Sequence, residues 1–130
     1  MRFRHKPTLK HFRRLGCEVC GASEQCAPDH VKTVGSGGSD VSWNLVSSCT
    51  RCHSKRHDGN TKLASLRAII CKREKISTTD LDCLTNFLWR LPARPTAADV
   101  LGLFLDMPLT VKARREAERI LDLHRIIWRQ

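Results

Sequence analysis

Cys17-Glu18-Val19-Cys20 and Cys49-Thr50-Arg51-Cys52 are two Cys-x-x-Cys pairs that stand at either end of one segment of the chain. Each pair brings two thiolates close enough to bind one tetrahedral Zn²⁺ ion together with the other pair. A segment this short has little apolar core of its own, so a metal clip between its ends would contribute much of its folding free energy. We therefore expect a structural zinc held by Cys17, Cys20, Cys49 and Cys52.

The remaining cysteines and the N-terminal residues bear on the cellular compartment. Seven cysteines are present in all, an odd number that fits metal ligands and spare thiols better than a disulfide framework. Met1 to Leu15 is basic and lacks the apolar stretch of a secretory signal, and no apolar run approaches the ~20 residues of a membrane span. We expect a cytoplasmic protein with no membrane segment, in which Cys71 and Cys83 are ordinary buried thiols.

The charge balance of the chain favours a polyanionic partner. Lys and Arg number 23 against 13 Asp and Glu, giving a formal net charge of +10. Nucleic acid is the first candidate and an anionic membrane surface the second, while a merely solvated basic surface is the alternative. Tyrosine is absent and aromatics are few, which argues against a stacking platform for single strands.

Between the cysteine pairs the pattern predicts strand, loop, strand and helix. Two short, partly apolar stretches, 27–31 and 41–46, flank a Gly-rich run at 35–40. A helix is expected from Ser48 to His57 or Asp58, with Gly59 placed to end it.

The flanking segments differ in character from this centre. Residues 1–16 form a basic arm without acidic residues, either helical after Pro7 with Thr8 as N-cap or disordered. Residues 61–130 show helical periodicity, broken near 76–80 and again by prolines, with a last apolar stripe from Val111 to Trp128. The fold class expected is α+β, divided into the arm (1–16), a zinc-closed core (17–60) and a helical extension (61–130).

Candidate catalytic side chains lie inside the zinc-closed segment. His53 and His57, at i and i+4, leave the same face of the expected helix and suit a metal ion, to which Asp29 would add an oxygen. His30 is a natural general base, and Asn44 has the donors and the acceptor needed to hold a loop. The alternatives are exposed or zinc-supporting histidines and a plain turn asparagine. Adjacent strand residues point to opposite faces, so Asp29 and His30 share a site only where the strand ends.

This constellation resembles the HNH endonuclease family, the ββα-metal nucleases. The three residues that name the family match His30, Asn44 and His53, and the Gly-rich run after His30 is similar to that of small bacterial and phage members. The resemblance covers 17–60 and implies a ββα-metal core. We accordingly expect a bacterial or phage-encoded protein acting in the host cell.

The resemblance also implies a mechanism and a set of ligands. Asp29, His53 and His57 would hold one divalent ion, chosen among Mg²⁺, Mn²⁺, Ni²⁺ and Zn²⁺. His30 would deprotonate the attacking water, Asn44 would brace its loop, and DNA products would carry 5′-phosphate and 3′-hydroxyl ends. Phosphate contacts are expected from basic residues of the arm, the loop and the helix, namely Arg2, Arg4, Lys32, Arg51, Lys55 and Arg56.

Two other functions remain open at this point. The same charge and zinc staple would serve a zinc module that binds nucleic acid without cutting it. An accessory protein, for example in phage DNA processing, would use its C-terminal helices to form a homodimer or to dock a partner. The stripe ending in Ile126-Ile127-Trp128 favours docking, although such a stripe is also typical of plain core.

Overall fold

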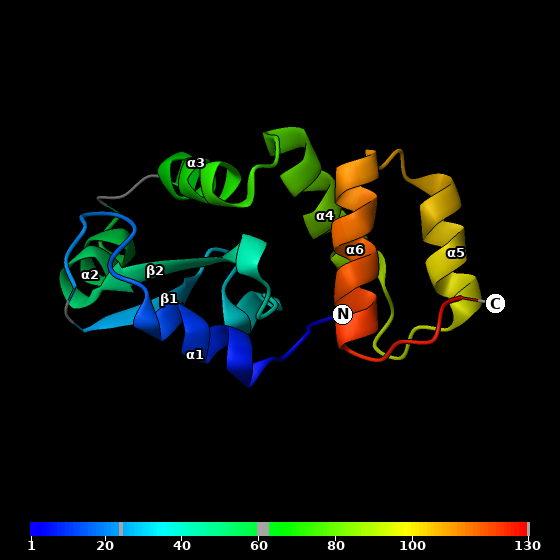
Figure 1. Cartoon of the computed structure of the whole chain (residues 1–130), viewed down its shortest axis with the longest axis horizontal. Helices are drawn as coiled ribbons and strands as arrows, with labels where there is room; N and C mark the ends of the chain where they lie inside the picture. Colours follow the sequence, from blue (N-terminus) through cyan, green and yellow to red (C-terminus); the bar gives the residue numbers. More distant parts are fainter. Residues whose placement is uncertain (24, 60–62, 130) are drawn as a thin grey trace. The chain divides into compact units, whose positions relative to one another are not determined.

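A computed structural model of the chain describes residues 1–23, 25–59 and 63–129. It is an α+β structure in which helices surround a small two-stranded sheet (Figure 1). The chain divides into two compact units, one formed by Phe3–Lys75 and the other by Met1–Arg2 with Ile76–Gln130. Within the described residues, every helix is too short or too polar to cross a membrane.

The sheet of the first unit is an antiparallel hairpin. Strand β1 (Cys26–His30) pairs with β2 (Leu45–Cys49) in a register that runs from Cys26 opposite Cys49 to His30 opposite Leu45. The first strand lies close to its predicted position, whereas the second begins later than predicted. A 3₁₀ turn, η2 (Ser42–Asn44), occupies the place of its expected first half. All five residues of β2 are buried, so this strand is the centre of the unit.

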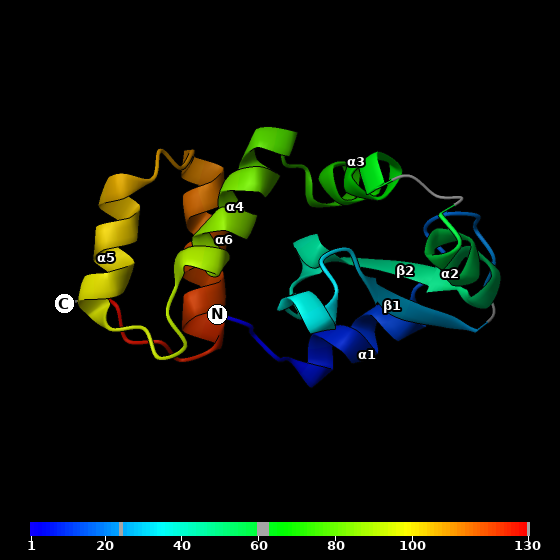
Figure 2. The same ribbon diagram turned by 180° about the vertical axis from the view of Figure 1, so that it is seen from behind.

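Three helices pack around the hairpin. Helix α2 (Thr50–His57) follows β2 directly and ends before Gly59, which has the left-handed φ of +77° that its predicted role requires. Helices α1 (Lys6–Arg14) and α3 (Leu63–Glu74) lie on opposite sides of the hairpin, below and above it in Figures 1 and 2. The predicted boundary at residues 60–61 lies outside the described residues.

The N-terminal arm is helical and is anchored to the hairpin unit. Its N-cap is His5, whose Nδ1 accepts the N–H of Thr8 at 3.3 Å, so the predicted cap at Thr8 was wrong by three positions. An imidazole nitrogen replaces the hydroxyl that usually satisfies the first turn. Phe12 is 2% exposed and fixes the helix to the core.

Arg73 near the end of α3 ties this helix to the segment that carries Cys17 and to β2. Its guanidinium donates to both carboxylate oxygens of Glu18 at 2.7 Å and to the main-chain carbonyl of Leu45 at 2.9 Å. Glu18 in turn accepts the main-chain N–H of Ser47 at 2.9 Å. The Arg73 and Glu18 side chains are 22% and 16% exposed, so this is a largely dehydrated ion pair that stitches three segments together.

The second unit contains the last three helices, α4 (Thr78–Arg90), α5 (Ala97–Asp106) and α6 (Val111–Leu123). The predicted break near 76–80 is present, and Ser77 caps α4 through the N–H of Asp80. Stacked Phe87 and Phe104 rings form its core, with Trp128 edge-on to Phe104. The predicted stripe fails at its end, because α6 stops at Leu123 and Ile127 is 82% exposed.

Candidate active site and metal centre

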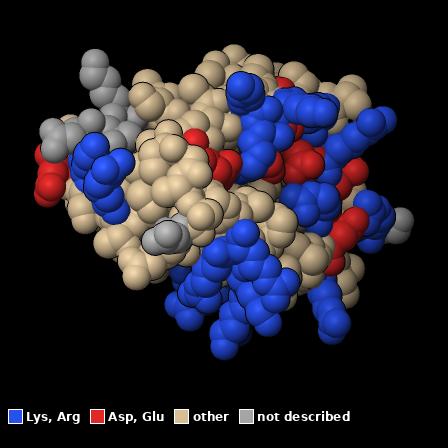
Figure 3. Space-filling view, turned by 60° about the vertical axis from the view of Figure 1, so that its left-hand side comes forward, with Lys and Arg blue, Asp and Glu red and all other residues tan. Residues whose placement is uncertain are grey.

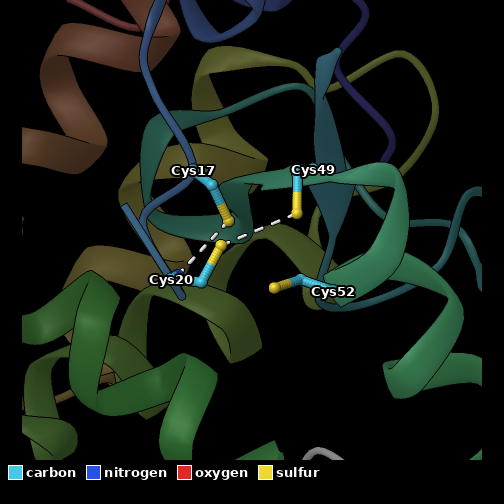
Figure 4. Close-up of side chains that lie close together, drawn as sticks. All are labelled: Cys17, Cys20, Cys49 and Cys52. Atoms are coloured by element: carbon cyan, nitrogen blue, oxygen red, sulfur yellow. Dashed lines mark hydrogen bonds between the residues drawn. The ribbon is translucent and has the colours of Figure 1, made fainter. Parts of the chain in front are cut away.

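The four predicted zinc ligands converge in the structure. The sulfur atoms of Cys17, Cys20, Cys49 and Cys52 all lie within 4.8 Å of one another (Figure 4). Tetrahedral thiolates at a Zn–S distance of ~2.3 Å are about 3.8 Å apart, close to the 3.7 Å between the Cys20 and Cys49 sulfurs. The cluster therefore has the composition and the spacing of a structural zinc site.

Local backbone geometry produces this cluster. Gly21 adopts a left-handed φ of +84°, which lets the chain turn back so that its N–H bonds to the carbonyl of Cys17 at 2.8 Å. Cys49 is the last residue of β2 and the N-cap of α2, so Cys49 and Cys52 flank the first turn of that helix. The positive end of a helix dipole favours thiolates at such a position.

Cysteine ionisation in the cluster is strongly uneven. Burial opposes ionisation of Cys17, but main-chain N–H groups, led by those of Cys49 and Cys20, outweigh it and lower its pKa to about 6. Burial raises the pKa of Cys52 to about 12, and hydrogen bonds to the neighbouring thiols add to this effect. Without a cation, the cluster thus keeps at least one thiol protonated at neutral pH, because four thiolates at this distance repel one another.

Asn44 holds together the loop that follows β1. Its Oδ1 accepts the N–H of Lys32 at 2.8 Å, while its Nδ2 donates to the carbonyls of Lys32 at 3.1 Å and Ser39 at 3.0 Å. Gly38 makes this closure possible, since a Cβ there would lie 1.7 Å from the Lys32 carbonyl oxygen. Asn44 is 9% exposed and bridges the two ends of the loop.

Asp29 points toward α2. Its Oδ1 accepts from Arg56 at 2.8 Å, and its Oδ2 lies 3.6 Å from Nδ1 of His53. The ring nitrogens Nε2 of His53 and His57 are 3.0 Å apart. The structure thus brings the three predicted ion ligands into one neighbourhood, although His53 offers different nitrogens to its two partners. The His53 side chain is 48% exposed, so packing does not lock its ring.

Arg56 connects the Asp29 side chain to the end of β1. Besides binding Asp29, it donates to the carbonyls of His30 at 3.1 Å and Val31 at 3.0 Å, and its side chain is only 14% exposed. The sequence analysis assigned Arg56 to DNA contact and missed these internal bonds. One signal was available: Arg56 follows Cys52 by four residues, so both leave the buried face of α2.

His30 has a different partner from Asp29. Its Nε2 lies 2.7 Å from Oδ1 of Asp40, a residue at the end of the Gly-rich loop that is 4% exposed. Among the described residues, no hydrogen bond or ion pair joins the His30 side chain to Asp29, His53 or His57. The link between the two groups is Arg56, which binds the Asp29 carboxylate and the His30 main chain. The sequence analysis did not identify Asp40.

Basic side chains surround this centre. Figure 3 shows Lys and Arg side chains gathered along the lower edge of that face, the level at which α1 runs in Figure 1. On α1, exposed basic residues fall within an arc of about 100° around the helix axis; they are Lys6, Lys10, Arg13 and Arg14. Arg4, Arg51 and Lys55 are also exposed, Arg2 and Lys32 partly so. An open hollow of about 280 Å³ lies beside His57 and is also lined by Thr33, Arg56 and Leu63.

Residues 17–59 match the model of the HNH endonuclease family, and this segment is therefore an HNH domain. The resemblance inferred from the cysteine pairs, His30, Asn44 and His53 is confirmed. The match ends before α3, so helices α3 to α6 lie outside it. HNH domains are generally nuclease domains that act on DNA. Comparisons of the chain with curated proteins and with solved structures found no match.

Proposed function

We propose that the protein is a metal-dependent endonuclease that hydrolyses phosphodiester bonds in DNA. The observation that carries this proposal is the arrangement of the HNH residues. His30 ends β1 with one ring nitrogen held, Asn44 closes the loop behind it, and Asp29 faces the histidines of α2. In this proposal the consecutive β1, β2 and α2 are the ββα-metal core, and α3 to α6 are a helical extension.

The donor set suits a divalent ion. Asp29 provides a hard oxygen, and His53 and His57 provide nitrogens, a mixed set that accepts Mg²⁺, Mn²⁺, Ni²⁺ or Zn²⁺. Arg56 occupies only Oδ1 of Asp29, so Oδ2 stays directed toward His53 and is available as the ligand atom. A bound ion would polarise the scissile phosphate and stabilise the charge that develops on it.

The protein side chains carry out the proton transfer and the positioning. Nδ1 of His30 removes a proton from water, the water oxygen forms a bond to phosphorus, and the bond from phosphorus to the 3′ oxygen breaks. The 3′ oxygen leaves and is protonated, which gives 5′-phosphate and 3′-hydroxyl ends. Asn44 keeps the loop closed, so that the carbonyl end of β1 and the His30 ring stay in register with α2.

Basic residues outside this centre hold the DNA backbone in the proposal. Arg2, Arg4, Lys32, Arg51 and Lys55 keep the role expected from the sequence, and the exposed basic face of α1 adds to them. Arg56 acts mainly within the protein. Phosphate contacts of this kind are independent of base sequence, so they position the duplex without selecting a site.

Supercoiled plasmid cleavage tests the proposal. Purified protein is incubated with Mg²⁺, Mn²⁺, Ni²⁺ or Zn²⁺, with EDTA as the metal-free control, and nicked and linear products are separated on a gel. Nicking in at least one metal is expected, with loss of about 10²- to 10⁴-fold in rate for His30→Ala. His11→Ala, the same change at an exposed histidine of α1, should keep the parental rate.

The competing function is a zinc module that binds nucleic acid without cutting it. The net charge of +10 and the four-cysteine cluster support both functions equally. Absence of cleavage in every metal, from folded protein that contains zinc and binds DNA, would select the binding module and refute the nuclease. Cleavage by His30→Ala at the parental rate would remove His30 from the mechanism.

A further inference from the structure

We propose that Asp40 is a positioning residue for His30: its buried carboxylate fixes the ring and selects the tautomer that leaves Nδ1 as the base. This inference rests on the proposed role of His30 in DNA hydrolysis and adds a residue that the pattern of an HNH domain does not name.

The hydrogen bond between the two side chains determines which nitrogen carries the proton. Asp40 Oδ1 lies 2.7 Å from His30 Nε2, and the side chains are 5% and 15% exposed. An ionised carboxylate only accepts hydrogen bonds, so Nε2 of the neutral ring must donate and the lone pair must reside on Nδ1. Among the described residues, none bonds to Nδ1, which is therefore free to accept a proton from water.

The carboxylate itself is held in place from the other side. Oδ2 of Asp40 accepts the N–H of His5 at 2.9 Å, and the N–H of Asp40 donates to the carbonyl of Phe3 at 2.8 Å. A third bond, from the N–H of Phe3 to the hydroxyl of Ser39 at 2.9 Å, runs alongside them. The N-terminal segment therefore fixes Asp40, and Asp40 fixes His30.

A fixed tautomer matters because a general base works only when its lone pair faces the proton to be removed. In Ser-His-Asp enzymes a buried carboxylate performs the same task for a histidine, and its replacement by an amide gives the wrong tautomer. The alternative role for Asp40 is a purely structural one, in which it staples the N-terminal segment to the loop. The two roles differ in what they predict for the His30 ring.

The Asp40→Asn variant separates these roles. The N–H of His5 requires an acceptor, so the amide oxygen of the variant should remain on that side and its NH₂ group should face His30. Nε2 of His30 must then accept, which moves the ring proton to Nδ1 and removes the base. The shape of the side chain and its bond to His5 are retained.

The kinetic arm measures kcat and KM for plasmid or duplex cleavage. Asp40→Asn should lower kcat by about 10²- to 10⁴-fold with little change in KM. Asp80→Asn is the matched control, because Asp80 is a buried carboxylate (8% exposed) of α4 that binds Thr110. Its kcat should equal that of the parent. An unchanged kcat in Asp40→Asn, or a rise in KM alone, would overturn the positioning role.

The second arm does not need activity. Two-bond ¹H–¹⁵N spectra of ¹⁵N-histidine-labelled protein at about pH 9, where an ordinary histidine is neutral, report the tautomer, and His30→Ala identifies the signal. The parent should show Nε2–H at His30, and Asp40→Asn, where it folds, should show Nδ1–H. An Nδ1–H tautomer in the parent would overturn the inference. If the parent does not cut DNA, the proposed function fails while this arm still decides what Asp40 does to His30.

Discussion

Replacing Arg56 with methionine should destabilise the HNH domain far more than an ordinary surface substitution. The change keeps most of the aliphatic stem but removes the bonds to Asp29 and to the carbonyls of His30 and Val31. The Asp29 side chain, 5% exposed, would lose its main cation. Removing one partner of a buried ion pair costs about 3 to 5 kcal/mol, a large part of the ~5 to 15 kcal/mol of a typical domain.

Urea unfolding combined with amide hydrogen exchange of the peptide spanning 45–57 would measure this loss in the relevant unit. Arg51→Met, the same change at an exposed residue of the same helix, should alter stability by no more than about 0.5 kcal/mol. Adding Asp29→Asn to Arg56→Met should recover part of the loss, because the uncompensated charge disappears. Equal effects of Arg56→Met and Arg51→Met would refute the reasoning that Arg56 is an internal clamp.

Three further predictions follow from other parts of the structure. Arg73→Met should lower the free energy of unfolding by about 3 kcal/mol or more, because Glu18 loses its cation; a change below 1 kcal/mol in urea unfolding would contradict this. Zinc binding to the metal-free protein at neutral pH should release protons, including that of Cys52, whose pKa is raised to about 12; affinity should therefore fall as pH falls, and calorimetry in buffers of different ionisation enthalpy would detect the release or its absence. Changing Lys10 and Arg13 of α1 together to glutamine should flatten the dependence of log K for DNA on log salt by about 0.9 per lost contact, and an unchanged slope would remove α1 from the DNA-binding surface.

Features set by local chemistry were predictable from the sequence. The cysteine pairs, the order of hairpin and helix, and the end of α2 at Gly59 all follow from spacing and backbone preference. The second strand was placed too early, because Val41 and Trp43 are apolar and buried but belong to a 3₁₀ turn and its cap rather than to a strand. Apolar residues in a short run do not distinguish these two conformations.

Features set by pairing across the fold were not predictable. Asp40 meets His30 because the loop folds back through Asn44 and Gly38, and no periodicity encodes that meeting. Arg56 is one of several basic residues on α2, and charge alone does not tell which of them turns inward. At the C-terminus, Arg125 has a φ of +57°, and the helical stripe loses its phase beyond that turn.

The most direct test of the central claim is the fate of the attacking water. Duplex DNA is cleaved by the parent protein in H₂¹⁸O with its preferred metal, and the new termini are analysed by mass spectrometry. The proposed hydrolysis predicts one ¹⁸O atom in each new 5′-phosphate and none in the 3′-hydroxyl ends, with no such product from His30→Ala. Products without ¹⁸O at the 5′-phosphate, or no products from folded protein containing zinc in any metal, would contradict it.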